Sequence, residues 1–195
     1  MQEEAKKLNA RSIVVAALVV EGFLVCLFFM WRAVRGYEDR ALAQGSDIVF
    51  GVLFALLLLA VNVVVMRCFS ETRFYRRHFD LVDQLMKPLA DSLGLFPALL
   101  VSLSAGVGEE LFFRAVLQTE FGIVVASIVF SLVHFGLAAK RYYVLVIVYA
   151  VIGVYFGLLF WAFASVWVPL IAHFVYDFLA LCYLRYCYDV YTNRE

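Results

Sequence analysis

Six long apolar stretches constrain the fold of this chain more than any other feature of its sequence. Each has close to the roughly 20 residues that an α-helix needs to cross about 30 Å of hydrocarbon. They cover approximately residues 12–31, 48–66, 96–117, 121–139, 142–164 and 166–183. Because backbone groups in lipid must be satisfied within the protein, the sequence predicts an all-α, polytopic transmembrane helix bundle with about six spans.

The composition agrees with a membrane protein and not with a soluble globular domain. Of the 195 residues, 65% are hydrophobic and 16% are charged, and the mean hydropathy is +0.91. Sixteen basic and sixteen acidic residues cancel, so the net charge favours no anionic partner, and we expect no nucleic-acid binding. We expect the lipid bilayer as a partner and one integral membrane domain over 1–195, with a motif-bearing core at about 96–184.

The basic residues predict the orientation of the spans. With six spans, twelve Lys and Arg residues fall on one side, in the two terminal tails, the 67–95 segment and the turn at 140–141. The other side has only Arg32, Arg35 and Arg40. The positive-inside rule therefore predicts that both termini are cytoplasmic. The 67–95 segment mixes aromatic, basic and acidic residues at roughly helical spacing, which predicts an amphipathic stretch on the cytoplasmic interface.

Several polar and ionisable side chains lie inside the predicted spans, where a bilayer disfavours them. Each charge near the bilayer centre costs roughly 2.5–3.5 kcal/mol on insertion scales. The set comprises Glu21, Asn62, Glu109, Glu110, Arg114, His134, His173 and Asp177. Such residues normally face one another or a water-filled cavity, so they predict a polar site inside the bundle.

Helical geometry separates the two adjacent glutamates. Glu110 and Arg114 are four residues apart, about 40° from eclipsed on one face of a helix. This spacing predicts an intrahelical ion pair with the acid N-terminal to the base. Glu109 lies roughly 140° from Arg114 around the helix, so it is left for other chemistry.

Two of the three histidines in the chain lie inside predicted spans. In F-S-L-V-H, Phe130 and His134 share one face of the fourth span, and in H-F-V-Y-D, His173 and Asp177 share one face of the sixth. A lone intramembrane histidine more often makes a packing hydrogen bond than catalyses a reaction. Together with the Glu-Glu-Arg cluster, we interpret both histidines as site residues.

Three motifs, in this order on successive spans, resemble the CPBP family. They are E-E-x-x-x-R at Glu109, Glu110 and Arg114, F-x-x-x-H at Phe130 and His134, and H-x-x-x-N/D at His173 and Asp177. This family contains type II CAAX prenyl endopeptidases and bacteriocin-processing or self-immunity proteins, also called Abi. The match covers about 106–177. The resemblance implies a glutamic-type intramembrane endopeptidase, a hydrolase that uses no cofactor.

The resemblance also implies a role for each motif residue. Glu109 and His134 would activate a water for attack on the scissile carbonyl, and His173 and Asp177 would stabilise the oxyanion. The site-supporting residues would be Glu110, Arg114 and Phe130. A donor from His173 aimed at the oxyanion would contribute several kcal/mol in a water-poor site. An ionised Asp177, where the family also has Asn, cannot donate, so we expect it to orient or protonate His173.

The predicted spans place the site residues at different depths. Straight helices would put Glu109 beyond mid-membrane, His134 nearer the cytoplasm and His173 nearer the far side. Either span boundaries shifted by several residues or a broken span would reconcile these positions. We expect a break or a close helix contact at Gly106 and Gly108, because irregular backbone at depth is tolerated only around a protein-lined cavity.

Other chemistries fit parts of this pattern. Glu109, His134 and His173 could ligate zinc in a metalloprotease, although the chain has no H-E-x-x-H motif. G-V-G-E and Y-D echo, in reversed order, the motifs of GxGD aspartyl proteases. The serines before the cluster lack the G-x-S-x-G context of a serine protease. A non-enzymatic immunity factor, or a transporter with a Glu, His and Asp proton relay, belongs to a different class.

The implied substrate is a peptide or protein in or at the membrane, cleaved near one terminus. The resemblance allows prenylated CAAX tails, double-glycine-type leader peptides or the C-terminal tails of sorted surface proteins. The short core, without a eukaryotic targeting signal, favours the last two and a prokaryotic inner or plasma membrane. We expect Glu21, in the centre of the first span, to pair with a polar group in the core or, as the alternative, to line the substrate entrance, and not to be catalytic.

Overall fold

The computed structural model describes residues 9–36 and 43–188, which are almost entirely helical and contain no strand. The predicted all-α bundle is confirmed. The α-helices are α1 (Ala10–Arg35), α2 (Gly45–Phe69), α3 (Arg73–Leu81), α4 (Lys87–Ser92), α5 (Leu95–Glu109), α6 (Thr119–Phe135), α7 (Tyr143–Phe163) and α8 (Trp167–Tyr186). Two π-helical segments, η1 (Val82–Met86) and η2 (Glu110–Gln118), and a 3-10 turn, η3 (Gly136–Ala138), connect some of them.

Five helical stretches in the described residues are long and apolar enough to cross a membrane. One of them, Leu95–Ala138, has 44 residues, and a straight helix of that length would measure about 66 Å, twice the hydrocarbon thickness. It is not straight, because Gly122 has φ 81° and ψ 167°, outside the helical region. The predicted third and fourth spans are therefore the two arms of one helical hairpin that turns at Gly122.

The hairpin brings its two arms to matching depths. Glu109 lies 13 residues before Gly122 and His134 lies 12 residues after it. Because the arms have nearly equal lengths, these two side chains meet at one level, and the predicted mismatch in depth does not occur. The chain does not break at Gly106 or Gly108, since α5 continues through both residues as a regular helix.

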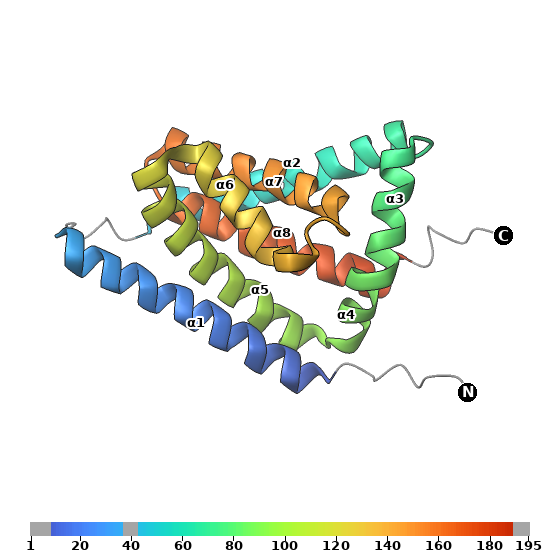
Figure 1. Ribbon diagram of the computed structural model, residues 1–195, viewed down its shortest axis with the longest axis horizontal. Helices are drawn as coiled ribbons and strands as arrows, with labels where there is room; N and C mark the ends of the chain where they lie inside the picture. The colour runs from blue at the N-terminus through green and yellow to red at the C-terminus, as the bar shows by residue number, and fades with distance from the viewer. Residues whose placement is uncertain (1–8, 37–42, 189–195) are drawn as a thin grey trace.

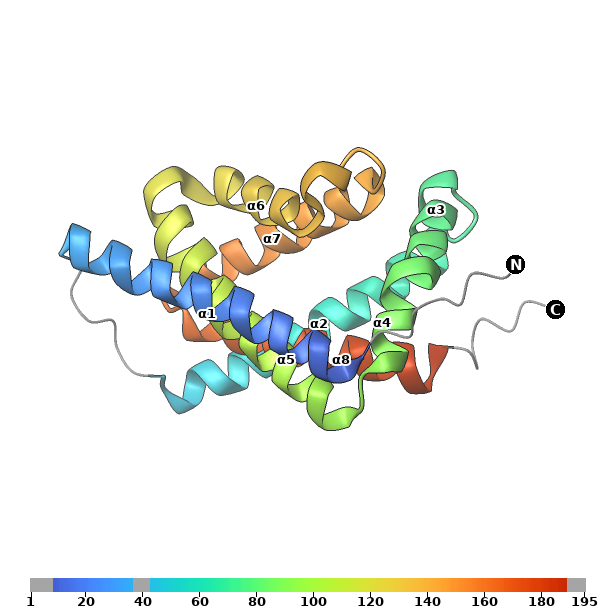
Figure 2. The same ribbon diagram turned by 60° about the horizontal axis from the view of Figure 1, so that its bottom comes forward.

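Helix α8 lies in the middle of the bundle (Figure 1). It packs against α2, α5 and α7, while α1 packs against α5, and α6 lies beside α7 in both views (Figure 2). One core cluster joins α2, α7 and α8 through Ala55, Leu58, Phe156, Leu159, Val168 and Ala172. Outward-facing residues such as Val19, Phe23 and Phe29 are exposed, as expected for a surface that contacts lipid tails.

The predicted amphipathic segment forms α3, η1 and α4, which lie across the end of the bundle where α1 begins and α8 ends (Figure 1). Buried Leu81 packs with Val144 and Leu145 at the start of α7. Arg185 of α8 donates to the backbone carbonyl of Ala90, at 3.2 Å, and to that of Asp91. The His78 side chain in α3 is also buried enough to lower the pKa of its imidazole. The segment therefore packs against the bundle.

The cytoplasmic position of this segment remains a prediction. The beginning of α1 and the end of α8 lie at the same end of the bundle (Figures 1 and 2). This arrangement agrees with an even number of membrane crossings. The terminal tails and Arg40, on which part of the predicted orientation depends, lie outside the described residues.

Gly106 and Gly108 allow α5 to approach two neighbouring helices closely, in agreement with the alternative expectation of a close contact. A Cβ atom on Gly108 would lie 2.5 Å from Glu21 Oε2 and 2.9 Å from the Glu21 carbonyl oxygen, in α1. A Cβ atom on Gly106 would lie 2.9 Å from the Leu170 carbonyl oxygen, in α8. Small residues at such contacts let helix backbones pack closely, which is a main source of association in lipid.

We predict that Gly106→Ala and Gly108→Ala each destabilise the protein by about 1–3 kcal/mol, because the added methyl group overpacks a helix contact. Thermal unfolding of the purified protein in detergent measures the effect. Gly22→Ala in α1 is the matched control, because a Cβ atom there has no neighbour within 4 Å. Equal melting temperatures for all three variants would contradict the close-contact interpretation.

Candidate active site

The two glutamates lie where α5 changes into a π-helix. Glu109 is the last residue of α5 and Glu110 the first residue of η2. Both side chains are buried in the interior of the bundle. The wider π-helical turn over Glu110–Gln118 was not predicted by the α-helical periodicity, and π-helical turns are frequent at functional sites.

The predicted ion pair between Glu110 and Arg114 is confirmed. Arg114 Nε donates to Glu110 Oε2 at 2.9 Å, and both side chains are fully buried. The guanidinium also lies over the ring of Phe130, with its Cζ atom 5.4 Å from the ring centroid, which adds a cation–π contact. Phe130 therefore supports the site through its ring, in the position that its motif predicts.

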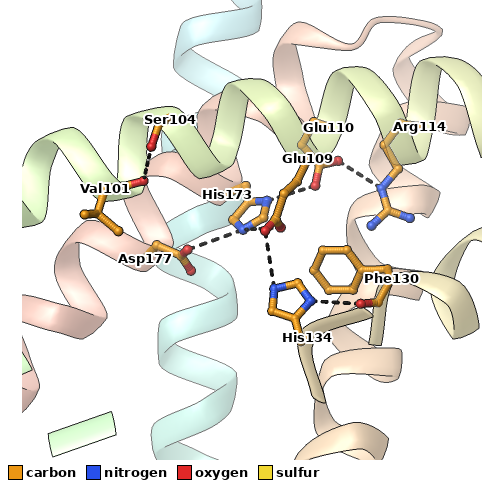
Figure 3. A network of polar contacts seen from close by, with 9 residues as sticks. All are labelled: Val101, Ser104, Glu109, Glu110, Arg114, Phe130, His134, His173 and Asp177. Atoms are coloured by element: carbon orange, nitrogen blue, oxygen red, sulfur yellow. Dashed lines mark hydrogen bonds and ion pairs between the residues drawn. The ribbon is translucent and has the colours of Figure 1, made fainter. Parts of the chain in front are cut away.

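Glu110 has a second partner that the sequence did not predict. Its Oε1 atom lies 2.9 Å from His173 Nδ1, so the carboxylate connects Arg114 to His173 (Figure 3). The ring of Phe156 stacks on the other side of the imidazole at 4.7 Å, with 16° between the planes. A carboxylate bonded to one ring nitrogen sets the tautomer and the orientation of a histidine. Because Glu110 binds Nδ1, the other ring nitrogen of His173, Nε2, faces Glu109 and Asp177.

Glu109 faces His134 from the opposite arm of the hairpin. Glu109 Oε1 and His134 Nε2 are 3.3 Å apart, and His134 Nδ1 lies 2.8 Å from the Phe130 carbonyl oxygen. When Nδ1 carries a hydrogen and donates it to that carbonyl, Nε2 is the nitrogen that remains for proton exchange. Glu109 and His134 can then share one proton between them, which is the arrangement that a general acid–base pair requires.

His173 and Asp177 complete the network. His173 Nε2 lies 3.4 Å from Asp177 Oδ2 and 3.7 Å from Glu109 Oε2. The structure therefore brings all four predicted catalytic side chains to one place, from three different helical segments (Figure 3). Their roles in a reaction remain predictions.

Accessibility differs among the four side chains. Asp177 is 35% exposed and His134 is 25% exposed, whereas Glu109 is 9% and His173 is 5% exposed. Asp177 belongs to α8 and His134 to the end of α6, so the site is most accessible from the side between these two elements. A substrate backbone that approached from there would meet His134 and Asp177 before it reached the two deeper residues.

The network carries an excess of acidic groups. Glu109, Glu110 and Asp177 face a single permanent cation, Arg114, and two histidines. Unpaired charges are costly inside a membrane protein, so protons bound by the histidines or by the acids must offset the difference. A cluster of carboxylates and imidazoles of this kind can take part in proton transfer to and from a water.

Three other polar residues singled out in the sequence lie around the network. Asn62 Nδ2 donates to the hydroxyl of Tyr176 at 2.6 Å, and so joins α2 to α8 beside the site. Ser104 Oγ donates to the carbonyl oxygen of Val101 within its own helix, at 2.9 Å. The Ser102 hydroxyl is buried without a hydrogen-bond partner.

Glu21 does not show the predicted pairing. Its side chain is buried against Gly108, next to Glu109 in the chain, and its Oε2 atom has no hydrogen-bond partner in the described residues. The zinc alternative names Glu109, His134 and His173 as ligands. Within 9–36 and 43–188, no group of three or more His, Cys, Asp and Glu side chains is arranged to hold a metal ion.

An aromatic wall beside His134 was missed by the sequence reasoning. The ring of Tyr149, in α7, lies 4.8 Å from the ring of His134 and 5.2 Å from that of Phe135. The spacing of Tyr149, Gly153 and Phe156 puts all three on the face of α7 that meets the site. That pattern was visible in the sequence, but a stripe of aromatic and small residues is also typical of ordinary helix packing.

The site-bearing part of the chain matches a known family. Residues 91–179, which include every motif residue from Glu109 to Asp177, match the family described as Type II CAAX prenyl endopeptidase Rce1-like. The predicted resemblance to the CPBP family is thus confirmed. The bundle is that of an integral membrane protein, and its residues 91–179 are similar to a family of CAAX-type endopeptidases.

A bacterial relative extends the similarity along the chain. "Uncharacterized protein YpbD" of Bacillus subtilis (strain 168) is 27% identical over 137 residues, which cover 70% of this chain and 68% of that protein. No solved structure matches the chain.

We predict that Glu110→Gln lowers the free energy of unfolding by about 3–5 kcal/mol, because it leaves the buried charge of Arg114 without its counter-charge. Adding Arg114→Met should recover part of the loss, since the unpaired charge is then also removed. Arg76→Gln is the control: its ion pair with Glu71 is exposed, so we expect a change below about 1 kcal/mol. Unfolding in detergent compares the variants. A loss no larger than that of Arg76→Gln would contradict the buried ion pair.

Proposed function

We propose that the protein is a glutamic-type intramembrane endopeptidase, which hydrolyses a peptide bond near a terminus of a membrane-associated substrate. One observation carries this proposal. Glu109 is buried beside His134, at 3.3 Å, while its neighbour Glu110 is already engaged by Arg114. A carboxylate in such a place, within a chain segment similar to endopeptidases, has the properties of a general base.

The first step uses Glu109 and His134. A water held between them attacks the scissile carbonyl carbon with its oxygen, while its proton passes to the Glu109–His134 pair. The C–O bond forms as the carbonyl π bond opens, and the negative charge moves to the carbonyl oxygen. The proton then passes to the amide nitrogen, the C–N bond breaks, and a carboxylic acid and an amine leave the site.

The second requirement is stabilisation of the oxyanion. Glu110, fixed by Arg114, accepts from His173 Nδ1, so a proton on His173 Nε2 would point toward the reacting group. Asp177, at 3.4 Å from the same nitrogen, orients the imidazole and compensates its charge. A preorganised donor in a site that excludes water stabilises the developing charge by several kcal/mol.

The proposed substrates are leader peptides or C-terminal membrane tails, in a prokaryotic inner or plasma membrane with both termini of the enzyme in the cytoplasm. Prenylated CAAX tails, as in the name of the matched family, are the third class. The partial exposure of Asp177 and His134 supports a substrate that approaches between α6 and α8. All three classes present an extended or unfolded stretch near a terminus, which can reach the buried Glu109.

We predict that Glu109→Gln abolishes cleavage, with a loss of at least about a thousandfold, because the variant cannot accept a proton from water. Membrane and secreted proteins of cells that express the wild type or the variant are compared by mass spectrometry of their N- and C-termini. The termini that disappear in Glu109→Gln identify both the substrate and the cleavage site. Glu71→Gln, at an exposed position outside the network, is the control and should leave these termini unchanged.

Folding and membrane insertion of Glu109→Gln are checked by its yield from membranes and its melting temperature in detergent. Cleavage that persists in a folded Glu109→Gln variant would sink the glutamate mechanism. If no terminus depends on the wild-type protein, the result would favour a non-enzymatic immunity factor or a transporter with the same residues as a proton relay.

We predict that strong chelators leave the cleavage rate unchanged within about twofold, because the proposed mechanism activates water with side chains and needs no metal. Purified protein is dialysed against a chelator such as EDTA or 1,10-phenanthroline. It is then assayed on a peptide that spans the mapped cleavage site. Loss of activity that is restored by added zinc would favour the metalloprotease alternative, with Glu109, His134 and His173 as ligands.

A further inference from the structure

Tyr149 is held against the network by three aromatic contacts. Its ring lies 4.8 Å from the ring of His134, 5.2 Å from that of Phe135 in an edge contact, and 6.3 Å from that of Phe130 in a stacked contact. Phe130 is itself fixed, since its ring packs edge-on against Phe113 at 5.2 Å. These contacts determine the ring position and leave the hydroxyl as the only polar group of the side chain.

The Tyr149 side chain is partly buried, and its hydroxyl makes no hydrogen bond within the described part of the chain. This hydroxyl, on a fixed ring next to His134, is a hydrogen-bond donor without an acceptor among the described residues.

The chemistry of the site lacks one donor. An oxyanion is best stabilised by at least two preorganised donors, and tyrosine hydroxyls can serve as such donors. On the α8 side, His173 provides one donor through Nε2. The next group there is a carboxylate, that of Asp177, which in its ionised form accepts hydrogen bonds and donates none. The second donor must therefore come from another element.

We propose that the Tyr149 hydroxyl is this second donor and contacts the carbonyl oxygen of the scissile peptide bond. The inference depends on the proposed endopeptidase function. While water adds to the carbonyl carbon and its proton moves to Glu109 and His134, the charge on the carbonyl oxygen is shared by hydrogen bonds from His173 and Tyr149. The hydroxyl keeps its proton throughout, so the step needs no further reactant.

The main test is Tyr149→Phe, which keeps the ring and its aromatic contacts and removes only the hydroxyl. We expect kcat to fall by about 10- to 100-fold with KM changed less than threefold, because the donor acts mainly in the transition state. The full-length protein in detergent is assayed on the peptide that spans the mapped cleavage site. Tyr155→Phe is the matched control: its hydroxyl, in the same helix, donates to the Phe54 carbonyl at 2.7 Å, outside the network, and kcat should change less than twofold.

A double-mutant cycle with Asp177→Asn separates donation from packing. An asparagine amide at this position can itself donate to the oxyanion. The loss caused by Tyr149→Phe should therefore be at least threefold smaller in the Asp177→Asn background than in the wild type. Equal losses in both backgrounds would overturn the idea that Tyr149 supplies a donor that Asp177 lacks.

The outcomes distinguish the two proposals. If Glu109→Gln abolishes cleavage and Tyr149→Phe cleaves like the wild type, the endopeptidase stands and the role of Tyr149 is refuted. If Glu109→Gln still cleaves, the endopeptidase mechanism fails first, and the inference about Tyr149 fails with it. If Tyr149→Phe does not fold, the hydroxyl has a structural role. This result also contradicts the inference, which assigns the hydroxyl no partner within the protein.

Discussion

The buried contact of Arg114 with Glu110 is the interaction on which the site depends. Both side chains are fully buried, and Glu110 also accepts from His173. One fixed carboxylate thereby neutralises the only permanent cation of the network and orients an imidazole from another helix. Without it, Arg114 would be an uncompensated charge in a low-dielectric interior, and His173 would lose the contact that determines which nitrogen faces the reacting groups.

The turn at Gly122 brings Glu109 and His134 to the same level of the bundle. A carboxylate in the first arm of the hairpin can meet a histidine in the second only when the two lie at similar distances from the turn. The positive φ of Gly122 permits the chain to reverse inside what is otherwise one long helix. Gly106 and Gly108 then hold the first arm closely against α8 and α1. The arrangement of the site thus depends on glycines, which let the chain turn at Gly122 and let α5 lie close to α1 and α8.

The two adjacent glutamates show how one helix can provide both support and reactivity. Glu110 points into a fully paired position, whereas Glu109 points toward two histidines and has one oxygen with no hydrogen-bond partner. The supporting residue has its charge compensated on two sides. The neighbouring carboxylate keeps the capacity to exchange a proton, because its partners can themselves be protonated. Tyr149 adds a neutral donor to a site that is otherwise rich in acceptors.

Sequence alone determined the helix bundle and the ion pair four residues apart, and it predicted which polar side chains meet inside the bundle. Apolar length, helical periodicity and three spaced motifs are local properties of the chain, and they do not depend on how helices pack. Only the tertiary structure decided that the hairpin turns at Gly122, that Glu110 reaches His173, and that Tyr149 lies against His134. Those features depend on packing between segments far apart in the chain, where small residues and matched arm lengths select one arrangement, and no local pattern specifies them.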